Sequence, residues 1–78
     1  MKLEIVTTEE VIFSEEVDIV VAPGSEGQLG ILPGHAPLIT SIKSGVVLTR
    51  HGSQEKVNNV SGGFLEVSDN NVRILADS

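Results

Sequence analysis

Few side chains in this sequence are placed to bind a metal or transfer a proton. The two imidazoles, His35 and His51, lie 16 residues apart, and neither belongs to an H-x-x-H or H-x-E pattern. Metal sites need His, Cys or carboxylate ligands at short spacing, and the chain has no Cys. We therefore predict no metal site. His51, beside Gly52, is predicted to be a solvated turn residue, and His35, in a Gly- and Pro-rich loop, is the better candidate for a contact.

The densest charge cluster is a set of carboxylates in the first quarter of the chain: Glu9, Glu10, Glu15, Glu16 and Asp18. Paired carboxylates can act as general acid and base or bind calcium, but these lack the spacing of an EF-hand loop and the Gly at its turn. The nucleophile motif G-x-S-x-G is also absent. We interpret the cluster as a solvated face and predict no catalytic residue.

A glycine-rich segment, Gly24–Gly30, superficially resembles a phosphate-binding loop. It lacks the terminal Lys-Ser/Thr of a Walker A motif, and Pro33 and Pro37 prevent the following helix whose N-terminus would face a phosphate. Its glycines are better explained by tight turns and close backbone approach. We predict no nucleotide site and no cofactor.

Composition excludes several classes of partner. The net charge is −6, and the five Lys and Arg residues are scattered along the chain, which also has no Trp or Tyr. A nucleic-acid site needs clustered cations and stacking surfaces, so no nucleic acid is expected. No apolar run approaches the roughly 20 residues of a membrane-spanning helix, so no direct membrane insertion is expected.

Strands are predicted from end to end. Of the 25 Val, Ile and Leu residues, 18 are β-branched, which favours strands because these side chains pack well on a pleated surface. Apolar and polar residues alternate repeatedly, as in Val17–Val21 and Val72–Ala76. Turn signals separate these runs about every 8–12 residues, the pattern of a sandwich or barrel. The turn signals are Pro23-Gly24, Gly34, Ser44-Gly45, His51-Gly52-Ser53, Gly62-Gly63 and Asp69-Asn70-Asn71.

Two hairpins are predicted near the C-terminus. Val46–Arg50 should pair with Glu55–Val60 around residues 51–53. Phe64–Ser68 should pair with Val72–Ala76 around residues 69–71, where Asp and Asn tolerate the left-handed backbone conformation. A single domain spanning residues 1–78 is expected.

Two dense blocks carry a resemblance to a known family. Gly24–Leu38, with the sequence GSEGQLGILPGHAPL, closely resembles the signature loop of the ATP synthase epsilon subunit. Ser61–Val67, followed by Asn71-Val72 and Ile74–Asp77, resembles the last two strands of the same domain. The resemblance covers essentially the whole chain. It implies a single β-sandwich of about ten short strands, with the C-terminal helical hairpin of the family absent from this chain.

The resemblance also implies a function: a non-catalytic central-stalk, or rotor, subunit that docks on the gamma subunit and the c-ring of an F-type ATP synthase. Carried over by position, Glu26 and Gln28 would contact the c-ring, and Thr7, His35 and Thr40 the gamma subunit. The resemblance implies a peripheral protein at the cytoplasmic, or matrix or stromal, face of an energy-transducing membrane. The isolated domain is expected to be monomeric.

Two other functions remain as alternatives. The first is a free-standing ligand-binding β-sandwich module, although carbohydrate sites usually contain Trp or Tyr, which this chain lacks. The second is an enzyme, for which no acid–base or nucleophile arrangement is present in the sequence. Binding to purified gamma subunit would distinguish the rotor subunit from both.

Overall fold

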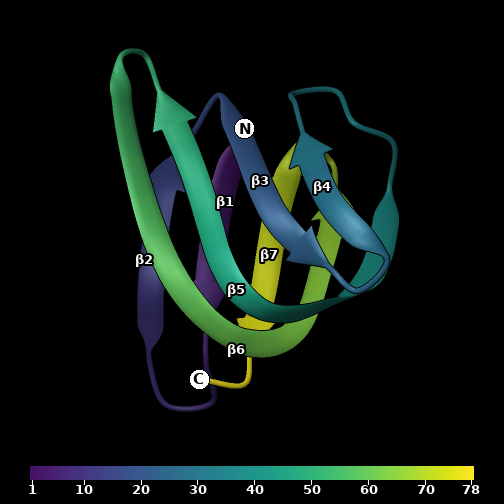
Figure 1. The fold of residues 1–78 in the computed structure, drawn as a ribbon. Helices are drawn as coiled ribbons and strands as arrows, with labels where there is room; N and C mark the ends of the chain where they lie inside the picture. The colour runs from purple at the N-terminus through teal and green to yellow at the C-terminus, as the bar shows by residue number, and fades with distance from the viewer.

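The computed structural model describes all 78 residues and contains strands and turns without a helix (Figure 1). The structure therefore contains no helix that could cross a membrane. The seven strands form one sheet in the order β2-β1-β7-β6-β5-β3-β4. The predicted all-β fold is confirmed. The strands are β1 (Lys2–Val6), β2 (Val11–Glu16), β3 (Ile19–Gly24), β4 (Gly27–Ile31), β5 (Leu38–His51), β6 (Gln54–Ser68) and β7 (Asn71–Ala76).

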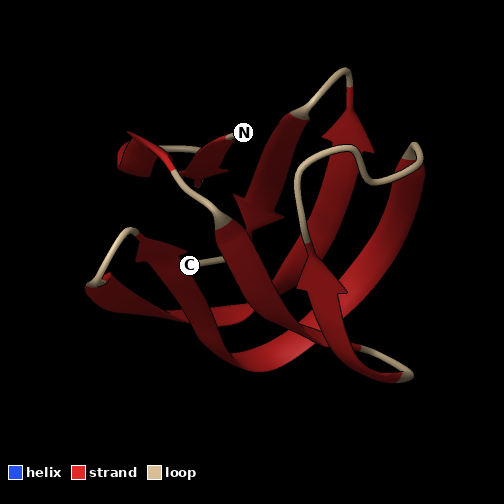
Figure 2. Ribbon diagram, turned by 90° about the horizontal axis from the view of Figure 1, so that it is seen from above, coloured by secondary structure: helices blue, strands red, loops and turns tan.

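The sheet curls back on itself and forms a two-layered sandwich, as the view from above shows (Figure 2). The strands β5 and β6 are 14 and 15 residues long and run through both layers. The β3 layer consists of β4, β3, the second half of β5 and the first half of β6. The β7 layer consists of the other halves of β5 and β6 together with β7, β1 and β2. All neighbours are antiparallel except β1 and β7, which are parallel.

Both predicted hairpins are confirmed, each with a two-residue loop. In the first, His51 pairs with Gln54, and the loop contains Gly52 at φ 62°. In the second, Ser68 pairs with Asn71, and the loop residues Asp69 and Asn70 have φ values of 50° and 62°. In this second hairpin both central residues have positive φ, which is the geometry of a type I′ turn, whose twist matches that of the flanking strands. Asn71, predicted as a turn residue, begins β7.

The sandwich has seven strands rather than about ten, and two of the predicted turns lie inside continuous strands. Ser44-Gly45 and Gly62-Gly63 are within β5 and β6, whose pairing keeps one register from Leu38↔Val67 to His51↔Gln54. Gly62 and Gly63 have φ values of 118° and 137°, so β6 bends there without a break in the ladder. Pro23-Gly24 ends β3, and the turn is the next two residues, Ser25-Glu26.

The interior is filled by the inward side chains of both layers, since alternate residues of a strand point to opposite faces. Burial of each large aliphatic side chain contributes about 1.5–3 kcal/mol, and every buried side-chain polar atom has a hydrogen-bond partner. Thr49 is the only buried polar residue. The 15 buried hydrophobic residues are Leu3, Ile5, Phe13, Val17, Val20, Ala22, Ile31, Ile42, Val47, Val60, Leu65, Val67, Val72, Ile74 and Ala76.

A polar contact closes one open side of the sandwich, where the edge strand β2 faces the first half of β6. The Lys56 ammonium donates to both carboxylate oxygens of Glu15 at 2.9 Å. The same ammonium lies 6.0 Å from the centre of the Phe13 ring, which is within the range of a cation–π interaction. This contact links the two layers where no backbone pairing does.

The bend in β6 predicts that a single methyl group added at Gly63 strongly destabilises the fold. A Cβ on Gly63 would collide with the Leu75 carbonyl oxygen, whereas a Cβ on Gly30 would meet nothing within 4 Å. Because the φ of Gly63 is also unfavourable for other residues, Gly63→Ala should lower the free energy of unfolding by about 2–3 kcal/mol. The matched variant Gly30→Ala should stay within about 0.5 kcal/mol of the wild type. Urea unfolding followed by circular dichroism measures both, and equal stabilities would contradict the role of the bend.

Candidate docking surfaces

The two predicted c-ring residues lie together at the hairpin between β3 and β4. Glu26 occupies the turn, and Gln28 is exposed at the start of β4, opposite Pro23. The turn is fastened to β5, because the Ser25 N–H donates to the Ser41 carbonyl at 3.2 Å and the two Ser hydroxyls lie 2.7 Å apart. The hairpin therefore presents its polar side chains at a fixed height above the sandwich.

His35 lies at the other end of β4, in the loop of residues 32–37. Its backbone N–H donates to the Leu32 carbonyl at 3.1 Å, and its Nδ1 is 2.7 Å from the Ala36 carbonyl oxygen. The loop is tied to the β6–β7 turn by the Gly34 N–H, which donates to the Asn70 side-chain oxygen at 3.4 Å. His35 is thus held at the end of the domain where β6 meets β7.

Thr7 and Thr40 are half-buried and do not lie beside His35. Thr7 follows β1 and organises the β1–β2 turn, where its Oγ1 accepts from the N–H groups of Glu9 and Glu10 at 3.2 Å. Because β1 starts beside the β6–β7 turn and runs away from it, Thr7 and His35 are at opposite ends. Thr40 is in mid-sheet, opposite Leu65. The three predicted gamma-contact positions are therefore spread along the domain.

The structure gathers no set of metal-binding side chains: no group of three or more His, Asp or Glu lies close enough to hold an ion. His51 is exposed in the β5–β6 hairpin, with its Nδ1 3.7 Å from an Asp18 carboxylate oxygen. The other oxygen of Asp18 accepts from the Gly52 N–H at 2.7 Å. Asp18 thus anchors the hairpin turn.

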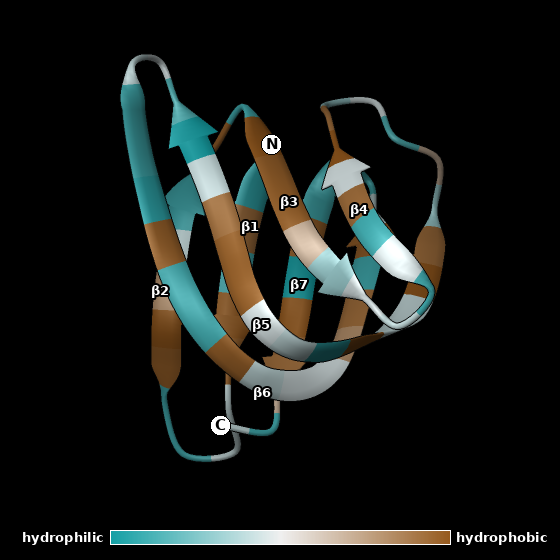
Figure 3. Cartoon of the chain, in the orientation of Figure 1, coloured by the Kyte–Doolittle hydropathy of each residue, from teal (hydrophilic) through white to brown (hydrophobic).

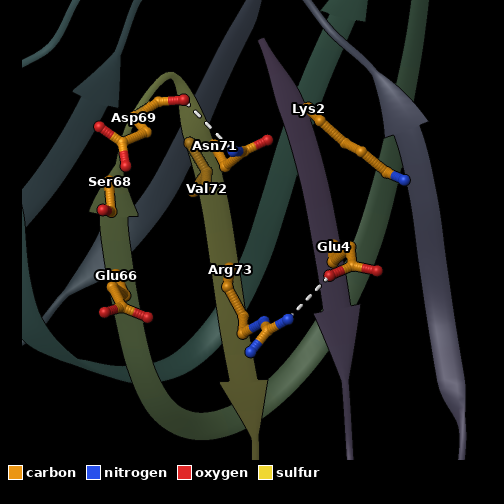
Figure 4. A pocket seen from close by; sticks show the side chains of 8 residues that line it. All are labelled: Lys2, Glu4, Glu66, Ser68, Asp69, Asn71, Val72 and Arg73. Atoms are coloured by element: carbon orange, nitrogen blue, oxygen red, sulfur yellow. Dashed lines mark hydrogen bonds and ion pairs between the residues drawn. The ribbon is translucent and has the colours of Figure 1, made fainter.

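The largest hollow, about 440 Å³ in volume, opens on the outer face of the β7 layer (Figure 4). Arg73 and Glu4 form an ion pair of 3.3 Å across it. The lining is almost entirely polar: Lys2, Glu4, Glu66, Ser68, Asp69, Asn71, Val72 and Arg73.

Apolar rows on both outer faces were not predicted from the sequence; Val6, Val21 and Leu48 in these rows are half-buried, and the other members are exposed. On the β7 layer, Val11, Val6, Leu75 and Phe64 are aligned across four strands. On the β3 layer, Val21, Leu48 and Val57 are aligned across β3, β5 and β6, and apolar stretches of β3 and β5 are visible in Figure 3. The available signal was two adjacent apolar residues in a strand, such as Phe64-Leu65 and Ile74-Leu75, since only one of each pair can face the core.

A small β-sandwich with a rigid polar hairpin and exposed apolar rows has the features of a protein-docking domain. Comparison with known families agrees with the β-sandwich fold. The family model described as ATP synthase, Delta/Epsilon chain, beta-sandwich domain matches residues 1–78. The chain belongs to this family.

Similar proteins are named ATP synthase epsilon chain. The ATP synthase epsilon chain of Dehalococcoides mccartyi is 55% identical over 78 residues, which are all of this chain and 56% of the relative. That of Carboxydothermus hydrogenoformans is 56% identical over 79 residues, with 58% of the relative covered. The chain therefore spans somewhat more than half the length of these relatives.

Two solved structures have the same fold. A chain in a structure of the Euglena gracilis mitochondrial ATP synthase, comprising OSCP, F1 and c-ring, has a TM-score of 0.90 at 26% identity, with 97% of this chain and 49% of that chain covered. A chain in the central stalk and c-ring structure of the Tetrahymena thermophila mitochondrial ATP synthase has a TM-score of 0.83 at 18% identity, with 99% and 63% covered. The second likeness shows the fold alone.

The link between the His35 loop and the β6–β7 turn can be tested by Asn70→Gly. Glycine suits the positive φ of this position, so the melting temperature should be unchanged or raised. The side-chain acceptor of the Gly34 N–H is lost, so exchange of that amide should accelerate about 2–10-fold, as expected for one hydrogen bond. The Gly52 amide, bonded to Asp18 in another turn, is the internal reference. Unchanged exchange at Gly34 would show that the link does not hold the loop.

Proposed function

We propose that this domain is a non-catalytic part of the central stalk of an F-type ATP synthase, which docks on the gamma subunit and the c-ring and so couples ion translocation to ATP synthesis. The observation that carries the proposal is the match of the whole chain to the ATP synthase Delta/Epsilon family. The Euglena structure, whose description includes F1 and c-ring, supports the same assembly. No cofactor is required for this role.

The c-ring contact is assigned to Glu26 and Gln28. The Ser25–Ser41 hydrogen bonds hold their hairpin against β5. A force applied at the tip of the hairpin is therefore transmitted to β5 instead of deforming the turn. A pre-organised hairpin loses little conformational entropy on docking. Because Gln28 is uncharged, it contributes hydrogen bonds rather than an ion pair.

The gamma contact is assigned to Thr7, His35 and Thr40. Since these positions extend from one end of the domain to the other, the contact is a long surface along the sandwich. The domain is then a peripheral component at the cytoplasmic, or matrix or stromal, face of the membrane, and it is monomeric in isolation.

The two contacts should be separable by mutation because Gln28 and His35 are at opposite ends of β4. His35→Ala should weaken binding to purified gamma subunit by about 1 kcal/mol, the usual loss for one contact outside a hot spot. Gln28→Lys should leave this affinity unchanged and impair ATP-driven ion pumping in the assembled enzyme. Isothermal titration calorimetry and a pumping assay provide the two readouts.

The matched control is Gln54→Lys, which makes the same substitution in the exposed β5–β6 hairpin and should affect neither readout. If Gln28→Lys abolishes gamma binding while His35→Ala has no effect, the two surfaces are assigned the wrong way round. If the wild-type domain does not bind gamma at micromolar concentration, the ligand-binding module becomes the better function.

The non-catalytic role predicts that the purified domain does not hydrolyse ATP. Neither His is part of an ion-pair or nucleophile arrangement beyond the His51–Asp18 contact. One hollow is lined by His51, Glu15 and Thr49, but the Glu15 carboxylate is bound to Lys56 and not to the imidazole. The measurement is phosphate release with His51→Ala as a comparison. Hydrolysis that co-purifies with the folded domain and falls in the variant would contradict the role.

A further inference from the structure

Strand β2 is the least firmly anchored strand of the sandwich. It lies at one edge of the sheet and pairs only with β1, in a ladder that contains a register shift. Of its six residues only Phe13 is buried, whereas β7 buries three of its six. The Glu16 carboxylate contacts the Met1 amino group at 3.0 Å, which again joins β2 to the β1 side. β2 is therefore attached to the core through β1 and one side chain of its own.

The other edge strand, β4, is held more firmly. Its Ile31 side chain is fully buried and Leu29 is half-buried. The turn before it is bonded to β5 through Ser25 and Ser41, so β4 has an anchor on a strand that is not its neighbour. The two edges of the same sheet can therefore be compared directly.

A single lysine from the opposite layer holds β2 in place. Phe13 and Glu15 point to the inner side, since their partners on β1 are the buried Ile5 and Leu3. The Lys56 ammonium donates to both carboxylate oxygens of Glu15 at 2.9 Å and lies 6.0 Å from the centre of the Phe13 ring. Lys56 thus contacts two successive inward residues of β2 at once, and it does so from β6, with which β2 has no backbone pairing.

The packing beside this contact is incomplete. A small hollow of about 40 Å³ lies there, and all but one of its six lining residues are polar. The volume is large enough for a water molecule, and the Lys56 and Glu15 side chains are 47% and 46% exposed. An ion pair that water can reach contributes little by itself and is screened by salt. The closed position of β2 is therefore held weakly.

Both ends of β2 are joined to points that are fixed independently of it. Before the strand, Thr7 organises a local turn, in which its N–H donates to the Glu10 carbonyl at 2.9 Å. After the strand, Val17 is buried in the core, and the Asp18 N–H donates to the Arg50 carbonyl at 2.7 Å. The strand between these points can leave the sheet without displacing its neighbours in sequence, which is the arrangement of a locally unfolding segment.

We propose that β2 is a strap that opens and closes while the rest of the sandwich stays folded, and that Lys56 holds it closed by binding Glu15 and the Phe13 ring together. In the closed position β2 completes the β7 layer and covers the open side of the sandwich. In the open position it withdraws Phe13 from the core and leaves one long side of β1 without hydrogen-bond partners. This property belongs to the domain itself and does not depend on the proposed function.

Native-state hydrogen exchange of the 78-residue chain tests the strap. Relative to their intrinsic rates, the β2 amides bonded to β1 should exchange at least about 10-fold faster than the amides that join β5 and β6, because a local opening costs less free energy than global unfolding. Their rates should also depend less on urea, since a local opening exposes less surface. The β4 amides bonded to β3 should be better protected than those of β2. A single rate and a single urea dependence for all three sets would show that β2 opens only with the whole domain, which overturns the proposal.

Lys56→Met tests the role of the lysine, and Lys43→Met is the matched control. Both changes keep an unbranched side chain and remove one positive charge, but Lys43 is exposed on β5 and forms no ion pair. Lys56→Met should accelerate exchange of the β2 amides about 3–10-fold, the combined effect of an exposed ion pair and a cation–π contact. The β5–β6 amides should stay within about 2-fold of the wild type, and Lys43→Met should change neither set. Circular dichroism and melting temperature verify that both variants fold.

Glu15→Gln and Glu55→Gln form a second matched pair, since Glu15 is paired with Lys56 at 2.9 Å and Glu55 with Arg50 at 2.8 Å. Only Glu15→Gln should accelerate exchange of the β2 amides, by about 1.5–5-fold. Added NaCl should accelerate the same amides in the wild type and have no further effect in Lys56→Met, because the screened ion pair is then absent. If Lys56→Met and Glu15→Gln act no differently from their controls, or accelerate all amides equally, Lys56 does not hold a strap and the proposal is overturned.

Discussion

The fold depends on the unbroken ladder between β5 and β6. These two strands keep one register from end to end, and they are the only elements present in both layers. Every other strand attaches to one half of this pair: β3 and β4 to one side, and β7, β1 and β2 to the other. The ladder can turn from one layer into the other because Gly62 and Gly63 adopt backbone conformations closed to other residues. Gly45 adds close contact, since a Cβ there would press against the Pro23 ring at 3.1 Å.

This construction leaves two outer faces of different character. The β3 layer has an apolar row with a self-neutralised Arg50–Glu55 pair at its side. The β7 layer combines an apolar row with carboxylates that lack a partner within the chain. The β3–β4 hairpin projects at one end, braced against β5. Since all three surfaces are carried by paired strands rather than long loops, their relative positions are fixed by the sheet.

Local features of the fold were predictable from the sequence. Alternating residues such as those of Val72–Ala76 gave the strands and their inward faces, and Asp69-Asn70 gave the turn because few other residues adopt positive φ. The sequence alone did not distinguish bends inside a strand from turns between two strands. Gly62-Gly63 has the composition of a loop, and only pairing on both sides of it shows that the strand continues. The parallel pairing of β1 with β7 could not be predicted either, because no local signal specifies a partner strand nearly a full chain length away.

For the candidate site, too, the sequence predicted the positions that depend on local structure and not those that depend on long-range strand pairing. Glu26 and Gln28 are close in sequence, so their common position on one hairpin followed from the turn. The positions of Thr7, His35 and Thr40 depend on long-range pairing, and the structure places them far apart. The row from Val11 to Phe64 requires the register of four strands before its members become neighbours, which explains why single residues such as Leu75 were not identified from the sequence.

The parallel pairing of β1 and β7 has a consequence for biosynthesis. The first strand of the domain, β1, lies between β2 and the last strand of the domain, and contacts such as Glu4–Arg73 join residues 69 positions apart. Until Asn71–Ala76 has emerged, one long side of β1 has no hydrogen-bond partner, and the inner residues Leu3 and Ile5 have no complete core to enter. Cooperative folding must therefore wait until nearly the whole domain has been synthesised. Topologies with such distant pairings fold in about milliseconds to seconds, an interval in which the nascent β1–β2 hairpin is open to chaperones.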